Sequence, residues 1–386
     1  MKRNKSLSIL KVWSTFQTEI KYHDHYLANC MREEGHETTF FASDSVEPAW
    51  KPFLKKKQFD LNETWSGHNI QRFPSITIAN KPFLIKISRF IRAFKLKQPD
   101  IIHLLGLAYP VNQLALLTSL LVSKAPVFVN EHGRLAANKN GWKAKLFYWN
   151  AYFIYQLFGR KKIKAFIAPN EESKAFIIDR YGVAPEKIHI IPLGFDETIF
   201  SLQGGMRNQE KDKLILGFAG KINADKRVDR ILKALAHSSS KEDILCKIAG
   251  FNQSNIAIKN ELESFAKEHQ LNVEFLPFLN SEELAAFYNH IDVAVYPGSI
   301  SITTIEANAC GTPILLNNSI QGLEDRVADG RGYLFTTEEE LRDKIEFYWT
   351  QKRTAQINHA DIANYTSKYS WRKISQEYLN LYYQYL

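Results

Sequence analysis

Short apolar runs alternate along this chain with longer segments whose apolar residues recur at helical spacing. In the first half, glycine, proline or polar residues bound the short runs, which therefore predict buried strands. Strands that alternate with helices are typical of an α/β domain with a parallel sheet and right-handed crossovers. The predicted strands are 7–12, 37–41, 70–73, 99–106, 125–133, 165–168 and 188–191, and the predicted helices are 23–34, 82–97, 110–123 and 171–181.

A second series of strands and helices follows a change in composition, where the apolar IIPLGFDETIF leads into the polar, glycine-containing SLQGGMRNQEKDK. We therefore expect an α/β protein with two doubly wound, Rossmann-like domains facing a cleft, over residues 1–195 and 196–370. Residues 371–386 are expected to form a C-terminal helix that packs back on the first domain. The second series comprises predicted strands 214–219, 244–249, 273–276, 293–296 and 314–316, and predicted helices 228–236, 256–269 and 282–289.

The stretch VAVYPGSISITTIEANACGTPILL (293–316) combines a strand, a polar loop, a short helix and a second strand. Pro297 and Gly298 end the first strand. Thr303 and Glu306 have the spacing of a capping box at a helix start. The N-terminus of such a helix presents unpaired N–H groups and a partial positive charge, which suit a phosphate. The alternative is that Glu306 only caps its helix.

Two features of the first half bear on ligand binding. The segment WSTFQTEIKYHD, after the first strand, contains no glycine, so a glycine-rich phosphate loop is absent there. The strand APVFVNEHG delivers Glu131 and His132 to its C-terminal end, the edge of an open α/β sheet where ligands bind. His132 is thus a candidate site residue, although a hydrogen-bonded structural histidine fits the same position.

Composition restricts the partners without choosing one. A chain of 386 residues is long enough for two domains. A formal charge of +9 suits an anionic ligand, an anionic membrane surface or nucleic acid. We do not expect nucleic acid to be the partner, because the basic residues are dispersed and form no recognition module. Three widely spaced cysteines (Cys30, Cys246 and Cys310) predict buried free thiols in a reducing compartment.

Two basic segments predict either membrane contact or ordinary packing. Residues 81–97 form a basic amphipathic pattern, and residues 139–164 place aromatic side chains between lysines. Both patterns are typical of a helix that lies in a membrane interface, and also of a surface helix packed on a neighbouring element. The N-terminal apolar run is too short for a signal peptide, and no window approaches a membrane span. We expect a cytoplasmic protein, with peripheral contact to the inner face of the membrane as an open alternative to ordinary packing.

Several motifs in the same order carry a family resemblance. IIPLGFDETIF, GFAGKINADK and IEANACGTPI lie in the second half, and GHETTFFAS and PDIIHLLG in the first. Together they resemble the retaining glycosyltransferases of family 4 type (glycosyl transferases group 1), which have the GT-B fold. The resemblance runs through nearly the whole chain and is strongest in the second domain.

The resemblance implies roles for individual residues. Lys221 and Lys226 match two cations that bind the pyrophosphate of a nucleotide sugar, and residues Ser301, Ile302 and Thr303 match the backbone N–H groups that meet the phosphates. Glu306 matches a glutamate that binds the ribose hydroxyls. His132 matches a histidine that approaches the donor sugar. Gly298 stands where the family has another glutamate, which usually contacts the sugar.

The implied activity is transfer of a sugar, with retention, from a UDP- or GDP-sugar to a glycan or lipid-linked acceptor, in bacterial cell-surface polysaccharide or glycoconjugate assembly. No cofactor and no metal are expected, since the family works without a metal and the chain has no DxD motif near the proposed site. An epimerase or a phosphorylase on the same scaffold would be expected to add site residues that are not seen. A non-catalytic, nucleotide-sugar-binding subunit of a glycosylation complex is the alternative from another class.

Overall fold

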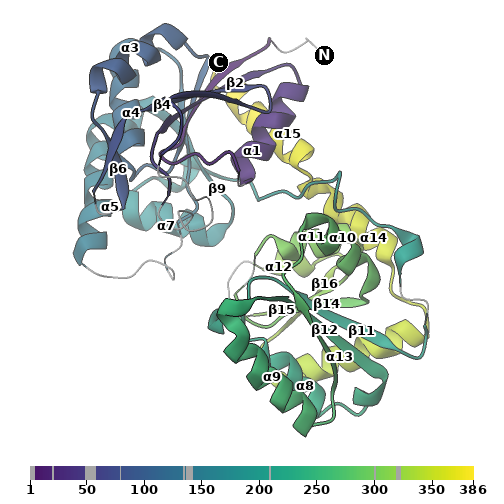
Figure 1. Ribbon diagram of the computed structural model, residues 1–386. Helices are drawn as coiled ribbons and strands as arrows, with labels where there is room; N and C mark the ends of the chain where they lie inside the picture. The colour runs from purple at the N-terminus through teal and green to yellow at the C-terminus, as the bar shows by residue number, and fades with distance from the viewer. Residues whose placement is uncertain are drawn as a thin grey trace. The chain divides into compact units, whose positions relative to one another are not determined.

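The computed structural model describes residues 5–19, 21–47, 58–78, 80–133, 135, 142–207, 210–299, 301–318 and 323–386, with the backbone alone at 142–145 and 206. Its contacts divide the chain into two compact units (Figure 1). The first unit comprises Met1–Leu193 with Arg372–Leu386, and the second comprises Gly194–Trp371. Each unit is an α/β structure on a mostly or wholly parallel sheet, which confirms the predicted fold class.

The sheet of the first unit has eight strands in the order β10-β9-β8-β7-β1-β2-β4-β3. Neighbouring strands are parallel except β3 and β4, which pair antiparallel at one edge. The central strands are buried along almost their whole length, as expected where helices cover both faces. The strands are β1 (Ser8–Val12), β2 (Glu37–Ser43), β3 (Asn62–Trp65), β4 (His68–Phe73), β7 (Ile101–Leu105), β8 (Val127–Asn130), β9 (Ile163–Ala168) and β10 (Ile188–Ile190).

Helices cover both faces of this sheet (Figure 1). One face carries four of them, and the other carries α1 and the C-terminal helix α15. Tyr378 of α15 donates a 2.9 Å hydrogen bond to Oδ1 of Asn130, and the hydroxyl of Tyr382 contacts Nδ1 of His103. The last helix is therefore part of the first unit. The helices are α3 (Ile87–Lys97), α4 (Pro110–Val122), α5 (Trp142–Ile154) and α7 (Glu171–Tyr181) on the first face, and α1 (His23–Glu33) and α15 (Trp371–Tyr383) on the second.

The helix predicted over 82–97 is wrong in its first turn. Residues 81–84 form strand β6 (Lys81–Leu84), which pairs antiparallel with β5 (Ser75–Ile78). Asn80 adopts the left-handed conformation at the turn, with φ 62°, so the chain reverses there and helix α3 begins only at Ile87. Pro82 had suggested a helix start, but it also fits a hairpin at a sheet edge, where its missing N–H is tolerated. Strand β3 was not predicted.

The aromatic segment predicted over 139–164 is not one continuous α-helix. Residues 139–141 lie outside the described residues. Residues 142–162 form α5, a π-helical turn (Tyr155–Gly159) and the short α6 (Arg160–Lys162), and the last two residues of the segment begin strand β9. The segment packs on α4 and α7, so part of its apolar surface belongs to the core of the unit.

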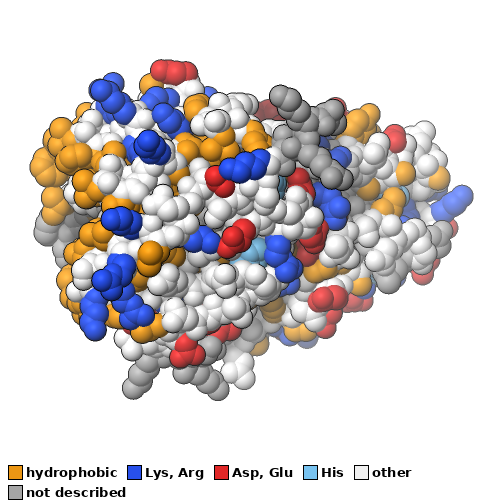
Figure 2. Space-filling view, turned by 90° about the horizontal axis from the view of Figure 1, so that it is seen from above, with side chains coloured by type: hydrophobic (Ala, Val, Ile, Leu, Met, Phe, Trp, Pro, Cys, Tyr) orange, Lys and Arg blue, Asp and Glu red, His pale blue; other side chains and the backbone are white. Residues whose placement is uncertain are grey.

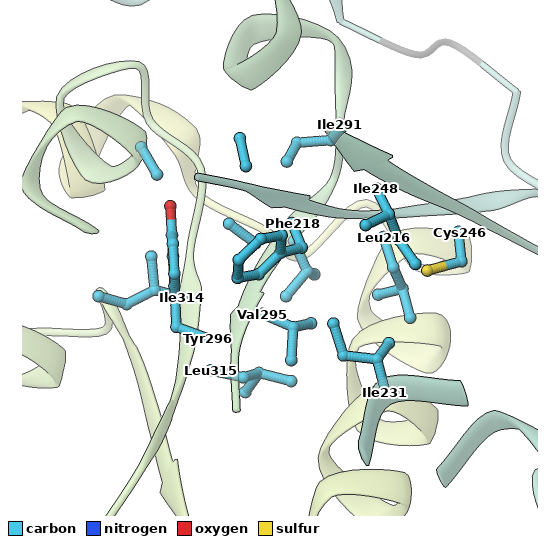
Figure 3. Close-up of a cluster of buried hydrophobic side chains, with 14 of the residues drawn as sticks. Leu216, Phe218, Ile231, Cys246, Ile248, Ile291, Val295, Tyr296, Ile314 and Leu315 are labelled. Atoms are coloured by element: carbon cyan, nitrogen blue, oxygen red, sulfur yellow. The ribbon is translucent and has the colours of Figure 1, made fainter. Parts of the chain in front are cut away.

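The second unit has a six-stranded, fully parallel sheet in the order β13-β12-β11-β14-β15-β16. Figure 3 shows Leu216, Phe218 and Val295 from its central strands in one buried cluster. Cys246 and Cys310 are buried free thiols, whereas Cys30 of the first unit, which forms no disulfide, is only half-buried. The strands are β11 (Leu214–Ala219), β12 (Ile244–Phe251), β13 (Asn272–Pro277), β14 (Val293–Tyr296), β15 (Ile314–Asn317) and β16 (Gly332–Phe335).

The strand order of this sheet reverses between β11 and β14, because successive strands add on one side of β11 up to β13 and on its other side from β14 onward. Ligands of open α/β sheets bind at the carboxyl ends of strands that flank such a switch point. We therefore expect a ligand site at the loops that follow β11 and β14. The helices are α8 (Asp229–Ala236), α9 (Ile256–Glu268), α10 (Ser281–His290), α11 (Thr303–Ala309), α12 (Glu324–Val327), α13 (Glu338–Arg353) and α14 (His359–Thr366).

Candidate functional site

The loops after β11 and β14 join at the switch point of the second sheet. Lys226 ends a 3-10 turn (Ala224–Lys226) in the first loop, and its Nζ donates a 2.7 Å hydrogen bond to the carbonyl oxygen of Ser299 in the second. The backbone N–H of Ser299 donates in return to the carbonyl oxygen of Asp225, at 2.8 Å. Lys221, at the start of the first loop, is exposed to solvent. The structure therefore places both predicted cations on one loop at this edge of the sheet.

Gly298 lies where the two loops come closest. A Cβ atom at this position would stand 2.1 Å from the carbonyl oxygen of Asp225 and 2.6 Å from the carbonyl carbon of Lys226. No side chain fits so near to backbone atoms. Only glycine at residue 298 therefore allows the two loops to approach this closely.

The short helix α11 begins as predicted at Thr303, but without the predicted capping box. Ile302 is the N-cap residue, and no side chain caps the helix. The hydroxyl groups of Ser301 and Thr303 lie 2.7 Å apart at the entrance. Glu306 therefore does not serve as a helix cap, and the alternative interpretation of this residue is wrong.

Glu306 has an unusual electrostatic environment. Burial, with a smaller contribution from the negative charge of Asp196, raises the pKa of its carboxyl group to about 7. Such a carboxyl group changes charge near neutral pH, a property that occurs frequently at functional sites. Arg326 of α12 donates a 2.7 Å hydrogen bond to Oγ1 of Thr304 in the first turn of α11. Asp196 lies in the motif IIPLGFDETIF but was not predicted as a site residue, and no motif contains Arg326.

His132 belongs to the first unit, whereas the other predicted site residues belong to the second. It follows β8, and its ring centroid lies 4.3 Å from that of His23, the first residue of α1. Burial and the charge of His23 lower the pKa of His132 to about 3, so the ring is neutral at physiological pH. A neutral imidazole can both donate and accept a hydrogen bond. His23 and the adjacent Asp24 were not predicted as site residues.

Two family models match consecutive parts of this chain. The model described as Glycosyltransferase Family 4 matches residues 22–198, and the model described as Glycosyl transferases group 1 matches residues 206–368. The chain belongs to the family 4 glycosyltransferases. The family resemblance of the sequence motifs is thereby confirmed.

This glycosyltransferase has distant relatives among known proteins. It is 29% identical over 171 residues to the D-inositol 3-phosphate glycosyltransferase of Streptosporangium roseum, a match that covers 40% of this chain and 39% of the relative. The chain thus spans about two fifths of the length of that curated relative. The similarity is too partial to carry over the relative's substrates.

Solved structures resemble the family 4 chain over its full length. A glycosyltransferase from Rickettsia africae has a TM-score of 0.72 and 15% identity, with 99% of both chains covered. HepE from Anabaena in complex with UDP has a TM-score of 0.71 and 14% identity, with 98% of this chain and all 100% of that chain covered. At such low identity these neighbours establish the fold alone, which is the GT-B fold.

Two kinds of feature are absent from the described residues. No group of three or more His, Cys, Asp and Glu side chains there is arranged to hold a metal ion. Nor does that part of the chain contain a helix that is both long and apolar enough to cross a membrane.

Proposed function

We propose that this protein transfers a sugar from a nucleotide-diphosphate donor to an acceptor hydroxyl group. The observation that carries the proposal is the hydrogen bond between Lys226 and Ser299. It places a cationic side chain of the β11 loop beside the loop that enters α11. Cations and helix-entrance N–H groups are the two kinds of donor that recur in diphosphate sites.

The diphosphate gains negative charge as the bond to the sugar breaks. Lys221 and Lys226 would stabilise that charge, as would the backbone N–H groups of residues 301–303. In its carboxylate form Glu306 would accept hydrogen bonds from the ribose hydroxyls. The Family 4 identity supports each of these roles, because the residues occupy the matching motif positions.

We propose a UDP- or GDP-sugar as the donor, with retention of configuration and no bound metal. UDP gains support from HepE, a structural neighbour that was solved with UDP. The sugar leaves and the acceptor attacks on the same face, and an oxygen of the departing diphosphate takes the acceptor proton. His132 is neutral, so it can orient the donor sugar through a hydrogen bond.

We further propose that the protein works on the inner face of a membrane, on acceptors for cell-surface polysaccharide or glycoconjugate assembly. Three segments of the first unit (75–97, 110–124 and 142–164) support this placement. They are adjacent, because α3 and the π-helical turn both contact α4. None contains Asp or Glu, and together they contain 13 Lys and Arg residues. We call their combined exposed face the basic-apolar surface.

The basic-apolar surface exposes large apolar side chains between its cations. Leu121 is 80% exposed, Leu157 70% and Trp149 59%. In Figure 2, orange and blue side chains predominate at the left, over the elements that Figure 1 also draws at the left. Apolar side chains that insert below lipid headgroups, beside cations that attract them, are typical of a peripheral membrane surface.

Two measurements test the proposed activity. A thermal-shift panel of UDP, GDP and ADP with their sugars identifies the donor, because a ligand that binds only the folded state raises Tm. Incubation with labelled donor sugars then reports transfer or slow hydrolysis. Binding of one nucleotide sugar without any turnover would contradict the enzyme and favour a non-catalytic nucleotide-sugar-binding subunit.

A further inference from the structure

A layer of buried charged and polar side chains lies between the first sheet and the helices α1 and α15. Lys11 projects from β1 and pairs with Asp24 of α1, and each side chain is only 3% exposed. His103 of β7 is the register partner of Lys11 and is also buried. A buried ion pair is weak evidence for stability, since its desolvation offsets the attraction between the charges. Its position at the C-terminal end of β1 suggests that it has another role.

The second carboxylate oxygen of Asp24 is directed at a histidine. Oδ2 of Asp24 lies 3.0 Å from Nε2 of His23, whose side chain is 9% exposed. Nδ2 of Asn130, at the end of β8, lies 2.8 Å from the same ring nitrogen. The hydroxyl of Tyr378 fixes this amide by donating to its oxygen at 2.9 Å. The Nε2 edge of the His23 ring therefore lies between Asp24 of α1 and Asn130 of β8, and it donates to the carboxylate when protonated or accepts from the amide when not.

The face of the His23 ring lies against His132. The two centroids are 4.3 Å apart and the rings are inclined by 36°. Because the His23 ring is held at its edge, it limits the orientations open to His132. The neighbouring His25 differs: its two ring nitrogens contact the backbone N–H of Tyr22 and the carbonyl oxygen of Gln17, at 3.0 and 2.7 Å. His25 thus stabilises the loop before α1, whereas His23 contacts ionic groups and the candidate site.

We propose that His23 is a positioning residue for His132, held by Asp24, which in turn pairs with Lys11. This inference rests on the proposed role of His132 toward the donor sugar. The proposal adds a series of contacts that runs from Lys11 through Asp24 and His23 to the ring of His132. No family motif named in the sequence contains these three residues.

Electrostatic coupling between the rings makes the proposal measurable. Burial lowers the pKa of His132, and the charge of His23 lowers it further. Burial alone would raise the pKa of Asp24, but His23 and Lys11 outweigh it and hold the value well below its ordinary range. The titratable groups that influence or face these residues are Lys11, Asp24, His25, His103, Tyr378 and Tyr382.

The test follows His132 by NMR of the histidine ring nitrogens over a pH titration of the full chain. In His23→Phe the neighbouring charge is absent, so the pKa of His132 should rise above its value of about 3. His23→Gln keeps hydrogen-bonding groups and serves as a second variant if His23→Phe is unstable. His189→Phe, on the edge strand β10, is the matched control and should leave the titration of His132 unchanged.

Kinetics separate positioning from donor binding. With a donor that the protein turns over, His23→Phe should lower kcat about tenfold or more while the Kd of the free nucleoside diphosphate stays the same, because the candidate phosphate and ribose contacts belong to the second unit. A folded His23→Phe protein with unchanged kcat and unchanged titration of His132 would overturn the inference. Absence of turnover in the parent protein, with the ring coupling intact, would instead refute the proposed function.

Discussion

The carbonyl oxygen of Asp225 stands 2.1 Å from the place that a Cβ atom on Gly298 would occupy. The same oxygen accepts the 2.8 Å hydrogen bond from Ser299. The loops after β11 and β14 thus meet backbone to backbone. A glutamate at residue 298, as the family pattern has it, is incompatible with this contact. The conformation of the two loops therefore requires glycine at residue 298, where the family motif has glutamate.

Replacing Gly298 with alanine should open this contact. We expect Gly298→Ala to lower the free energy of unfolding by about 1–3 kcal/mol, as overpacking does, and to weaken binding of UDP or GDP. Gly204→Ala is the matched control, because a Cβ at Gly204 meets no atom within 4 Å. Urea unfolding and calorimetric titration of both variants measure the two effects. Equal stability of the two variants would show that the loops can separate at no cost.

Lys226 is expected to contact the diphosphate. Lys226→Ala should weaken UDP or GDP binding about 10- to 100-fold, since a charge-assisted hydrogen bond contributes roughly 1.5–3 kcal/mol. Binding of the nucleoside alone should change little, because it carries no phosphate. Lys233→Ala is the control, since this exposed lysine pairs with Asp229 at 2.8 Å on α8. If nucleoside and nucleoside diphosphate lose affinity equally, Lys226 orders the loop and does not touch phosphate.

The sequence predicts the second unit better than the first, for a physical reason. Parallel strands buried on both faces are continuous apolar runs, so β11 and β14 were predicted with their observed bounds. Strand β3 has the polar sequence NETW and lies at an edge, where pairing with β4 forms it without an apolar signal. Hairpin β5–β6 was missed because proline is common both at the start of a helix and in an edge strand. The sequence pattern around Pro82 therefore could not distinguish the two.

The residues of the candidate site also differ in how well the sequence predicts them. Lys221, Lys226 and Gly298 lie in local motifs that directly follow strands, so sequence could identify them. His23 and Asn130 are 107 residues apart in the chain, and their contact arises only when β8 and α1 pack in the first unit. Glu306 was identified, but the expected capping box was wrong because Ile302, not Thr303, is the N-cap residue.

Nucleotide binding should depend on pH through Glu306. Its pKa is raised to about 7, and only the carboxylate can accept hydrogen bonds with both oxygens from ribose hydroxyls. Affinity for UDP or GDP should therefore fall as pH falls through about 7. The terminal phosphate titrates in the same region, with a pKa of about 6 for a phosphate monoester. Glu306→Gln separates the two contributions, because the pH dependence of affinity that this variant loses is due to Glu306. Asp196→Asn should move the Glu306 contribution to lower pH, since it removes a negative charge that raises the pKa of Glu306.

The same shift predicts an effect on stability. The folded state holds the Glu306 proton more tightly than the unfolded state, whose pKa is near the ordinary 4.5. Stability from this group is fully present below that pKa and is lost as pH rises toward 7. Glu306→Gln should thus be more stable than the parent at pH 8, on the order of 1–3 kcal/mol, and similar to it at low pH. Urea unfolding at pH 8 and pH 4 measures both. An equal difference at the two pH values would mean that the carboxyl is not buried in the folded protein.

Membrane contact is expected to depend on the apolar side chains of the basic-apolar surface as well as on its charges. Burial of one leucine side chain in the interface contributes about 1.5–3 kcal/mol, so Leu121→Ser with Leu157→Ser should lower partitioning more than tenfold. Sedimentation with vesicles of phosphatidylglycerol and phosphatidylcholine measures it, and vesicles of phosphatidylcholine alone should bind the parent protein weakly. Phe278→Ser removes a comparably exposed side chain of the second unit, 64% exposed, and should leave binding unchanged.

High salt should release the parent protein from the vesicles only in part, because salt does not screen the apolar contribution. Full retention by the double variant would show that this surface does not insert into lipid.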